Sequence, residues 1–244
     1  MPISVQRLTR VYGDFTAVDD LSFEVGAGEI VGLIGPNGAG KTTTLRSLAG
    51  ILRPTSGHVV IDGHDIVSDP IEAKRRLAFM PDEPHLFEYL TVEEHLRLIA
   101  RLYAVDDFAA RSDALVRELE LTGKERSVPG ELSRGMRQKV VIACGLVRRP
   151  PVLLFDEPLT GLDPLGIRRM KNSIVQRARG GAAIVLSSHL LHLLEEVCTH
   201  VLILKSGVKI ADGTLAEVAA RFSNGESGVS LEEVFIRATG GAEQ

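Results

Sequence analysis

A glycine-rich loop near the start of the chain has residue types that could bind phosphate. The loop consists of Gly35, Pro36, Asn37, Gly38, Ala39, Gly40, Lys41, Thr42 and Thr43. Its glycines let backbone N–H groups turn toward phosphate oxygens, and the helix predicted after it directs its positive end at the same anion. Lys41 adds a cation near the outer phosphates, and the Thr42 hydroxyl can bind Mg²⁺. The spacing predicts a nucleoside triphosphate site; the alternative is an ordinary turn between a strand and a helix.

Two carboxylates follow a later apolar run. Asp156 and Glu157 come directly after residues 152–155, which we predict to form a strand. Ligands of open parallel sheets lie at the carboxyl ends of the strands. We expect Asp156 to hold Mg²⁺, directly or through water, and Glu157 to orient and polarise the attacking water in phosphoryl transfer. A solvated acidic strand end before a proline is the ordinary alternative, and the upstream loop 35–43 favours the catalytic interpretation.

Ser133 and His189 are weaker candidates, because each has a common structural explanation. Ser133 is predicted to cap a helix over residues 134–147, and a helix start with a hydroxyl and Gly135 can also bind an anion. His189 follows a predicted strand over residues 183–186, so its imidazole would lie beside the two carboxylates and could reach a γ-phosphate. Otherwise it caps a helix. Five further histidines show no ligand spacing and are expected at the surface or in hairpins: His58, His64, His85, His95 and His200.

The elements that must position these residues follow from hydrophobic patterning. Alternation with period two predicts antiparallel strands near the N-terminus, and continuous apolar runs predict buried parallel strands later in the chain. A middle block with helical spacing predicts a helical lobe inserted into an α/β core. The predicted segments are strands at 3–8, 17–25, 30–34, 59–61, 152–155, 183–186 and 201–204, a tight turn at 62–63, the lobe at about 86–150, and helices at 165–179 and 231–239. We therefore predict one domain over residues 1–222, followed by a linker and a short C-terminal helix within residues 223–244.

Composition limits the functional classes. The 244 residues carry a formal net charge of −4, which gives no support for broad binding of nucleic acid or anionic membranes. No apolar run reaches the roughly 18 residues of a membrane-spanning helix, and the N-terminus lacks the apolar core of a signal peptide. Cys144 and Cys198 lie in apolar sequence and are expected to be reduced, buried thiols in the cytosol. A membrane role would therefore need a separate partner.

In their order along the chain, these motifs resemble those of the nucleotide-binding subunit of ATP-binding cassette transporters. The resemblance covers about residues 3–239, nearly the whole chain. The matching segments are the phosphate loop 35–43, the signature 132–136, the acidic strand 152–157, the D-loop 161–163 and the switch histidine His189. The resemblance implies a P-loop NTPase core with a mainly parallel sheet, an N-terminal antiparallel β subdomain and an inserted helical lobe. Tyr12 matches the adenine-stacking aromatic of the family, and a place in the core is its alternative.

Two positions depart from the family pattern. Asp82 stands where the family has a glutamine, and Arg134 replaces a signature glycine. A carboxylate can still bind Mg²⁺, but it cannot donate a hydrogen bond when it is ionised. Ser133 and Gly135, the signature residues most suited to touch phosphate, are kept. We therefore expect Asp82 to retain a place in the metal site.

The resemblance implies a head-to-tail pair of subunits that hydrolyses ATP with Mg²⁺. Each ATP would lie between the loop 35–43 of one subunit and Ser133 and Gly135 of the other, and the second subunit could be identical or different. The roles implied are catalysis by Lys41, Glu157 and His189, metal binding by Thr42, Asp156 and Asp82, and nucleotide binding by Tyr12 and the loop residues.

The resemblance also implies a partner and a location. A subunit of this kind would lie in the cytoplasm on the inner face of the cell membrane and drive a separate integral membrane permease. Residues 82–89 would pass on the motion, with Phe87 and Tyr89 as interface anchors unless they pack under the helical lobe. Residues 230–235 resemble the tail of cassettes paired with export-type permeases.

Two alternatives to transport remain at this point. One is a soluble cassette ATPase that acts on a macromolecule in translation, repair or cluster assembly without a permease. The other is a small-molecule kinase with a phosphate loop, which would leave the signature and His189 unexplained. The charge balance gives no reason to expect a nucleic-acid partner.

Overall fold

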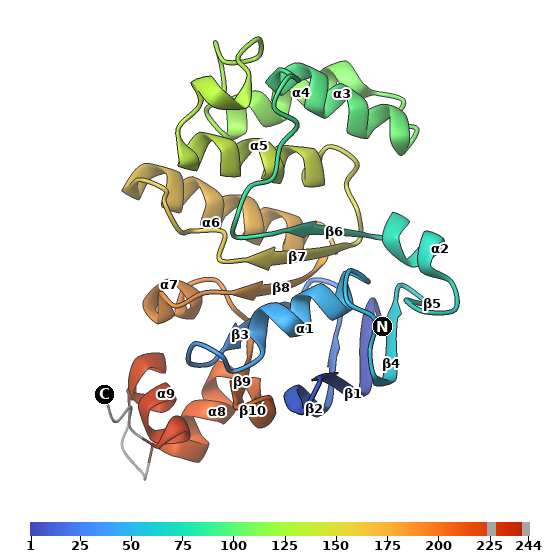
Figure 1. Cartoon of the computed structure of the whole chain (residues 1–244). Coiled ribbons are helices and arrows are strands. Elements are labelled where there is room, and N and C mark those ends of the chain that lie inside the picture. The colour runs from blue at the N-terminus through green and yellow to red at the C-terminus, as the bar shows by residue number, and fades with distance from the viewer. Residues whose placement is uncertain (224–227, 241–244) are drawn as a thin grey trace.

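The computed structural model describes residues 1–223 and 228–240, and Figure 1 labels its elements. A six-stranded sheet crosses the middle of the molecule. In the order of the sheet, its strands are β10 (Val208–Thr214), β9 (His200–Lys205), β3 (Ile30–Ile34), β8 (Ala183–Ser187), β7 (Val152–Asp156) and β6 (Leu77–Met80). The strands from β9 to β6 pair in parallel, and β10 is antiparallel to β9.

A four-stranded antiparallel sheet lies beside the parallel one. Its strands, in order, are β2 (Phe15–Val25), β1 (Ile3–Tyr12), β4 (Ser56–Ile61) and β5 (His64–Asp65). The turn between β4 and β5 has φ of 47° at Asp62 and 87° at Gly63, the left-handed pair that suits a tight hairpin. The predicted N-terminal antiparallel subdomain and the predicted turn are thus both present.

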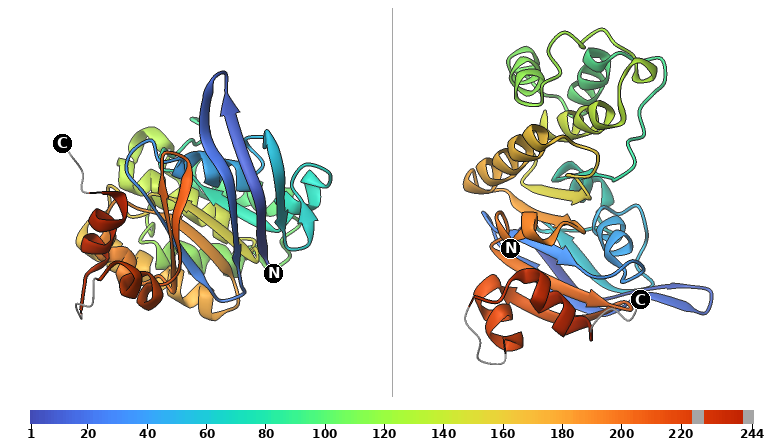
Figure 2. Two further views of the ribbon diagram at one scale, coloured as in Figure 1. Left: turned by 90° about the horizontal axis from the view of Figure 1, so that it is seen from below. Right: turned by 90° about the vertical axis from the view of Figure 1, so that its left-hand side faces the viewer.

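Helices lie on both faces of the six-stranded sheet, as the two views of Figure 2 show. They are α1 (Lys41–Leu48), α2 (Pro70–Arg75), α3 (Val92–Leu102), α4 (Phe108–Glu118), α5 (Arg134–Leu146), α6 (Pro164–Arg179), α7 (Leu191–Glu195), α8 (Leu215–Phe222) and α9 (Leu231–Thr239), with a 3₁₀ turn at Pro129–Glu131. Helices α3, α4 and α5 form the lobe at the top of Figure 1, while α8 and α9 lie at the opposite end beside β10.

Two buried cores lie on the two faces of the parallel strands. Along β7, Leu153 and Phe155 belong to one core, and Val152 and Leu154 belong to the other. The first, named here the α5 core, also holds the buried side chains of α5 and α6. The second, the α1 core, holds those of α1, β1, β2 and β4. Burial on both faces is why these strands are continuously apolar in sequence.

Predicted and observed elements agree best where the elements are long. Helices α6 and α9 begin and end within one residue of their predicted ranges. Helices α2 and α8 were missed, because six and eight residues give only a weak helical repeat. Within the predicted linker and tail, residues 224–227 and 241–244 lie outside the described part of the chain.

Both cysteines are free thiols, as the sequence predicts. Cys198 is buried, and that burial raises the pKa of its thiol to about 12. Cys144 is only half-buried, which corrects the expectation that it is buried as fully. Across the described ranges, none of the helices combines the length and apolar character needed to cross a bilayer.

Candidate active site

The candidate site forms where four neighbouring parallel strands end. Strands β3, β8, β7 and β6 lie side by side, so the residues that follow them meet at one edge of the sheet. The phosphate loop follows β3, and Asp82 lies two residues beyond β6. Asp156 and Ser187 are the last residues of β7 and β8, and Glu157 and His189 come just after those strands. Sequence order therefore becomes spatial proximity through the parallel topology alone.

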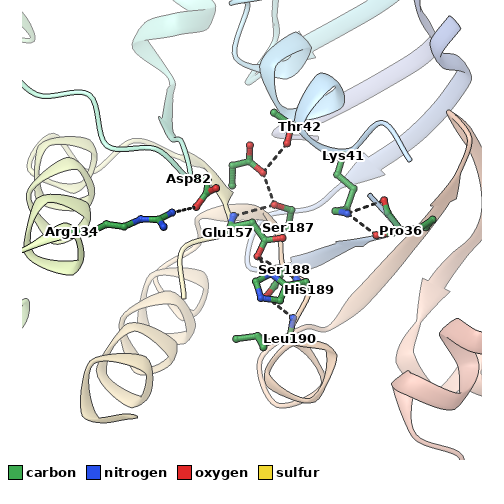
Figure 3. Close-up of polar contacts among 12 residues, drawn as sticks. Pro36, Lys41, Thr42, Asp82, Arg134, Glu157, Ser187, Ser188, His189 and Leu190 are labelled. Carbon is green, nitrogen blue, oxygen red and sulfur yellow. Dashed lines mark hydrogen bonds and ion pairs between the residues drawn. The ribbon is translucent and has the colours of Figure 1, made fainter. Parts of the chain in front are cut away.

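The phosphate loop joins β3 to α1 through a left-handed residue. Gly40 has φ of 100°, and a Cβ at this position would lie 2.5 Å from the Ala17 carbonyl oxygen, so a side chain has no room here. Lys41 Nζ donates to the carbonyl oxygens of Gly35 (2.6 Å) and Pro36 (3.2 Å), as Figure 3 shows. The loop therefore places a lysine ammonium directly over its own backbone.

The electrostatic surroundings of Lys41 act in two directions. Burial lowers the pKa of its ammonium below the ordinary value, whereas the charges of Glu157 and Asp156 favour the protonated form. Phosphate oxygens are stronger acceptors for a cation than carbonyl oxygens are. A triphosphate could therefore take over the contacts that Lys41 now makes within the loop.

Asp156 is the centre of a small hydrogen-bond network. Its Oδ1 accepts from the hydroxyls of Thr42 (3.3 Å) and Ser187 (2.7 Å), and the residue is 4% exposed. A hydroxyl and a carboxylate at one point are oxygen donors of the kind that Mg²⁺ prefers, so this pair fits a magnesium ion. Sequence reasoning missed the contact of Ser187, which the structure explains because Asp156 and Ser187 are register partners at the ends of β7 and β8.

Glu157 has an unusual backbone conformation and two partners. Its φ is 51°, in the left-handed region that residues other than glycine rarely adopt. Its N–H donates to the carbonyl oxygen (3.2 Å) and the hydroxyl (3.1 Å) of Ser187. Its Oε2 accepts from the N–H (3.2 Å) and from Nδ1 (2.8 Å) of His189. Because an ionised carboxylate only accepts, this contact places the proton of His189 on Nδ1.

The signature residues lie at the start of α5 in the helical lobe. Ser133 is the N-cap of α5, as predicted, and its Oγ accepts from the Met136 N–H (3.2 Å). Among the described residues, no hydrogen bond joins Ser133 to the loop 35–43. A Cβ on Gly135 would lie 2.7 Å from the Gly161 carbonyl oxygen, so the first turn of α5 touches the segment before α6.

Asp82 lies at the same sheet edge, but its side chain turns toward the lobe. Arg134 Nη2 and Asp82 Oδ1 are 3.3 Å apart, and Figure 3 shows the two side chains pointing at each other. No hydrogen bond joins Asp82 to Thr42 or Asp156, all three of which are in the described chain. The metal-site expectation for Asp82 thus stays a prediction, and its observed partner is an arginine.

The segment after Asp82 contains one clear correction. His95 was expected at the surface or in a hairpin, but it is 4% exposed within α3. Its Nε2 accepts from the Phe87 N–H (2.9 Å), and the two rings stack with centroids 6.0 Å apart. The sequence does not indicate this contact with Phe87, because a histidine is not counted among the apolar residues of a helix face and His95 lies in no ligand pattern. Tyr89 is 89% exposed, so it does not pack under the lobe.

Tyr12 ends β1 and is 41% exposed as a residue, which argues against the core alternative. The guanidinium of Arg10 lies over the ring, 4.4 Å from the centroid, and donates to the Arg53 carbonyl oxygen. A cation on one side of an aromatic ring restricts the ring and leaves its other face able to stack.

The comparisons with known proteins decide the family. Residues 18–160 match the family model described as ABC transporter. The chain is 34% identical over 239 residues to the ABC-type transporter ATP-binding protein EcsA of Bacillus subtilis, covering 97% of this chain and 96% of that protein. The chain belongs to the ATP-binding cassette family. It is also 38% identical over 214 residues to the Nod factor export ATP-binding protein I of Burkholderia pseudomallei, covering 87% of the cassette and 70% of that protein.

Solved structures agree with this assignment. The cassette is similar to the structure of an ATP-binding subunit of an ABC transporter, with a TM-score of 0.91, 36% identity and coverage of 98% and 99% of the two chains. It is also similar to the dimeric structure of the bacterial ABC transporter cassette MJ0796, with a TM-score of 0.80, 25% identity and coverage of 87% and 98%. The predicted α/β fold is therefore confirmed, and the cassette is an ATPase of this family.

Proposed function

We propose that the cassette hydrolyses ATP with Mg²⁺ in a head-to-tail pair and thereby drives a membrane permease. The observation that carries this proposal is the gathering of Lys41, Asp156, Glu157 and His189 at one sheet edge, while Ser133 caps α5 and, within the described chain, has no hydrogen bond to any of them. These residues form one side of an ATP pocket, and the signature residues 132–136 of a second subunit would form the other side. The dimeric cassette among the similar structures supports this arrangement.

Within the pocket, we assign phosphate binding to the loop 35–43 and adenine stacking to Tyr12. Backbone N–H groups and Lys41 hold the triphosphate, which also meets the positive end of α1. Ser133 and Gly135 of the second subunit approach the same phosphates from the start of its α5. Closure of the pair excludes water, so the charges inside act more strongly.

The metal and the attacking water belong to the residues after β7 and β8. Thr42 and Asp156 would hold Mg²⁺, which neutralises phosphate charge when it is bound. Glu157 orients and polarises the water, and His189 fixes the Glu157 carboxylate through its N–H and its Nδ1 proton. The strained backbone of Glu157 aims the carboxylate rigidly, which suits a reaction that depends on positioning.

Replacing the proposed base tests the mechanism. Glu157→Gln keeps the size of the side chain but removes its charge, so ATP hydrolysis should fall by about 100-fold or more. ATP binding should persist, and the variant should accumulate as a nucleotide-bound dimer in sedimentation experiments. Lys41→Ala should instead weaken ATP binding, while Lys124→Ala, at an exposed site, serves as the matched control. Near-normal turnover in Glu157→Gln would remove Glu157 from its role.

The permease is proposed to dock on an apolar groove beside the lobe. Phe87, Tyr89 and Leu98 line this groove with Glu88 and Leu90, and their exposed fractions are 62%, 89% and 41%. Large apolar side chains that remain exposed are common anchors of protein interfaces. The hydrogen bond from the Phe87 N–H to His95 fixes this segment to α3. A short apolar segment of a permease is the occupant that fits.

Export is the direction we propose, and the cytoplasmic face of the cell membrane is the location. The support is the similarity to a relative named for Nod factor export, together with a C-terminal α9 that begins at Ser230-Leu231 as in the export-type pattern. Co-purification distinguishes this proposal from the alternative of a soluble cassette that acts on a macromolecule. Recovery of ribosomes or nucleic acid without a membrane protein would favour it.

A further inference from the structure

The two departures from the family pattern are in contact with each other. Asp82 and Arg134 are 52 residues apart in sequence, yet Arg134 Nη2 lies 3.3 Å from Asp82 Oδ1. Both side chains are about half exposed, at 46% and 57%. The pair connects the end of β6 in the α/β core with the first turn of α5 in the helical lobe (Figure 3).

The position of Asp82 makes this pairing chemically significant. Met80 of β6 pairs with Phe155 of β7, so Asp82 lies two residues beyond β6, level with the acidic end of β7. Its carboxylate is therefore near the pocket edge that Thr42 and Asp156 define, although it contacts neither of them. As observed, its charge faces Arg134 of the lobe and not the metal side.

The position of Arg134 is equally informative. It stands between Ser133, the cap of α5, and Gly135, where a Cβ would lie 2.7 Å from the Gly161 carbonyl oxygen in the segment before α6. Its own side chain passes near Gly161 of that segment. A contact of Arg134 therefore also acts on the first turn of α5, the part of the lobe that is proposed to meet the second subunit's ATP.

We propose that Arg134 is a positioning residue that holds Asp82 away from the metal until ATP and Mg²⁺ arrive. Asp82 then exchanges the guanidinium for the metal side of the pocket, and the start of α5 loses one of its ties to the core, while Gln138 of α5 still donates to the Pro81 carbonyl oxygen (2.9 Å). This inference rests on the proposed function. An exposed ion pair of this kind contributes little to stability, so it can open readily when a divalent cation competes for the carboxylate.

The exchange depends on charge at both positions. A glutamine at position 82 would bind neither Arg134 nor Mg²⁺ as strongly, and a glycine at position 134 would leave Asp82 without its partner. The two departures therefore explain one another, because each supplies what the other needs. Metal entry and freedom of the lobe become linked through a single carboxylate.

A Mg²⁺ titration of nucleotide binding tests the exchange. The titration uses a fluorescent ATP analogue and the Glu157→Gln background, in which hydrolysis does not interfere. Arg134→Met removes the competitor of the metal, so the Mg²⁺ concentration for half-maximal binding should fall by up to about fivefold. Arg134→Lys should restore the background value. Arg101→Met, an exposed arginine of α3 in the same lobe, is the charge-matched control and should change nothing.

The double variant separates the exchange from a general charge effect. Asp82→Asn should raise the Mg²⁺ requirement, and in that background Arg134→Met should have no further effect. An Arg134→Met effect that persists with Asp82→Asn, or its absence in an otherwise normal background, would overturn the exchange alone. Failure of the Glu157→Gln background itself to bind the nucleotide would instead count against the proposed function. Melting temperatures of all variants verify that each is folded.

Discussion

Gly135 has a structural requirement that is separate from any contact with nucleotide. A Cβ here would lie 2.7 Å from the Gly161 carbonyl oxygen, a backbone atom that cannot move aside freely. Two effects of an alanine therefore oppose each other. Helix propensity favours alanine by up to about 1 kcal/mol, and overpacking costs about 1–3 kcal/mol. The cost of the clash should be the larger effect, because the Cβ is fixed to the backbone of α5 and the oxygen that it meets is also a backbone atom.

We therefore expect Gly135→Ala to lower the free energy of unfolding and to weaken ATP-driven pairing. Denaturant unfolding and sedimentation with ATP measure the two effects. Gly130→Ala is the matched control, since a Cβ at Gly130 meets nothing within 4 Å. A Gly135→Ala variant more stable than the parent would show that helix propensity dominates and that the contact with Gly161 is loose.

Residue types predicted which functional side chains lie together better than they predicted the residues that support them. The end of each strand indicated Asp156, Glu157 and His189, because parallel topology brings such ends together. Ser187 carries no signal of its own, since a serine at a strand end is ordinary. The Asp82–Arg134 pair was out of reach, because its partners belong to elements whose relative placement no local pattern encodes.

At the scale of elements, Arg148 joins the lobe to the core just beyond the end of α5. Its guanidinium lies over the Tyr103 ring, 3.9 Å from the centroid, at the end of α3. It also donates to the carbonyl oxygens of Lys74 (3.3 Å) and Arg75 (3.4 Å) at the end of α2. One planar side chain thus contacts the ends of both α2 and α3, and it satisfies carbonyls that a helix end leaves open.

Arg148→Ala should reduce the free energy of unfolding by about 1–3 kcal/mol, through the lost ring contact and the unsatisfied carbonyls. Arg148→Lys should recover only part, because an ammonium lacks the planar fork. Denaturant unfolding measures both, with the exposed Arg126→Ala as control. Equal stability of the alanine variant and the parent would mean that α2 and α3 are held by apolar packing alone.

At the scale of the whole molecule, one exposed groove is the proposed docking site of a permease. Tyr89 is 89% exposed beside Leu98 and Phe87. We expect Tyr89→Ser to lower the permease recovered with the cassette from solubilised membranes by roughly tenfold, as for a central interface residue. Ile71→Ser, at a 67% exposed apolar site on α2, is the control. Unchanged recovery of a membrane protein with Tyr89→Ser would move the docking site elsewhere.

Much of the architecture followed from the sequence because its strongest patterns are either continuously apolar or long. Continuous apolar runs indicated the buried parallel strands, and helical spacing indicated α6 and α9. Short elements escaped, since α2 is only six residues long and is held by its neighbours more than by its own pattern. How the lobe sits on the core depends on contacts such as Arg148 with Tyr103, which join distant parts of the chain.

The division of the interior into an α1 core and an α5 core determines which buried side chains a movement of the helical lobe would disturb. The phosphate loop leads into the first, and Ser133 begins a helix rooted in the second, with a sheet between them. A movement of the lobe would act first on the second core, because the buried side chains of α5 lie there and those of α1 do not. A cavity made among the buried side chains of α5 should therefore change the rate of the ATPase cycle more than the affinity for nucleotide.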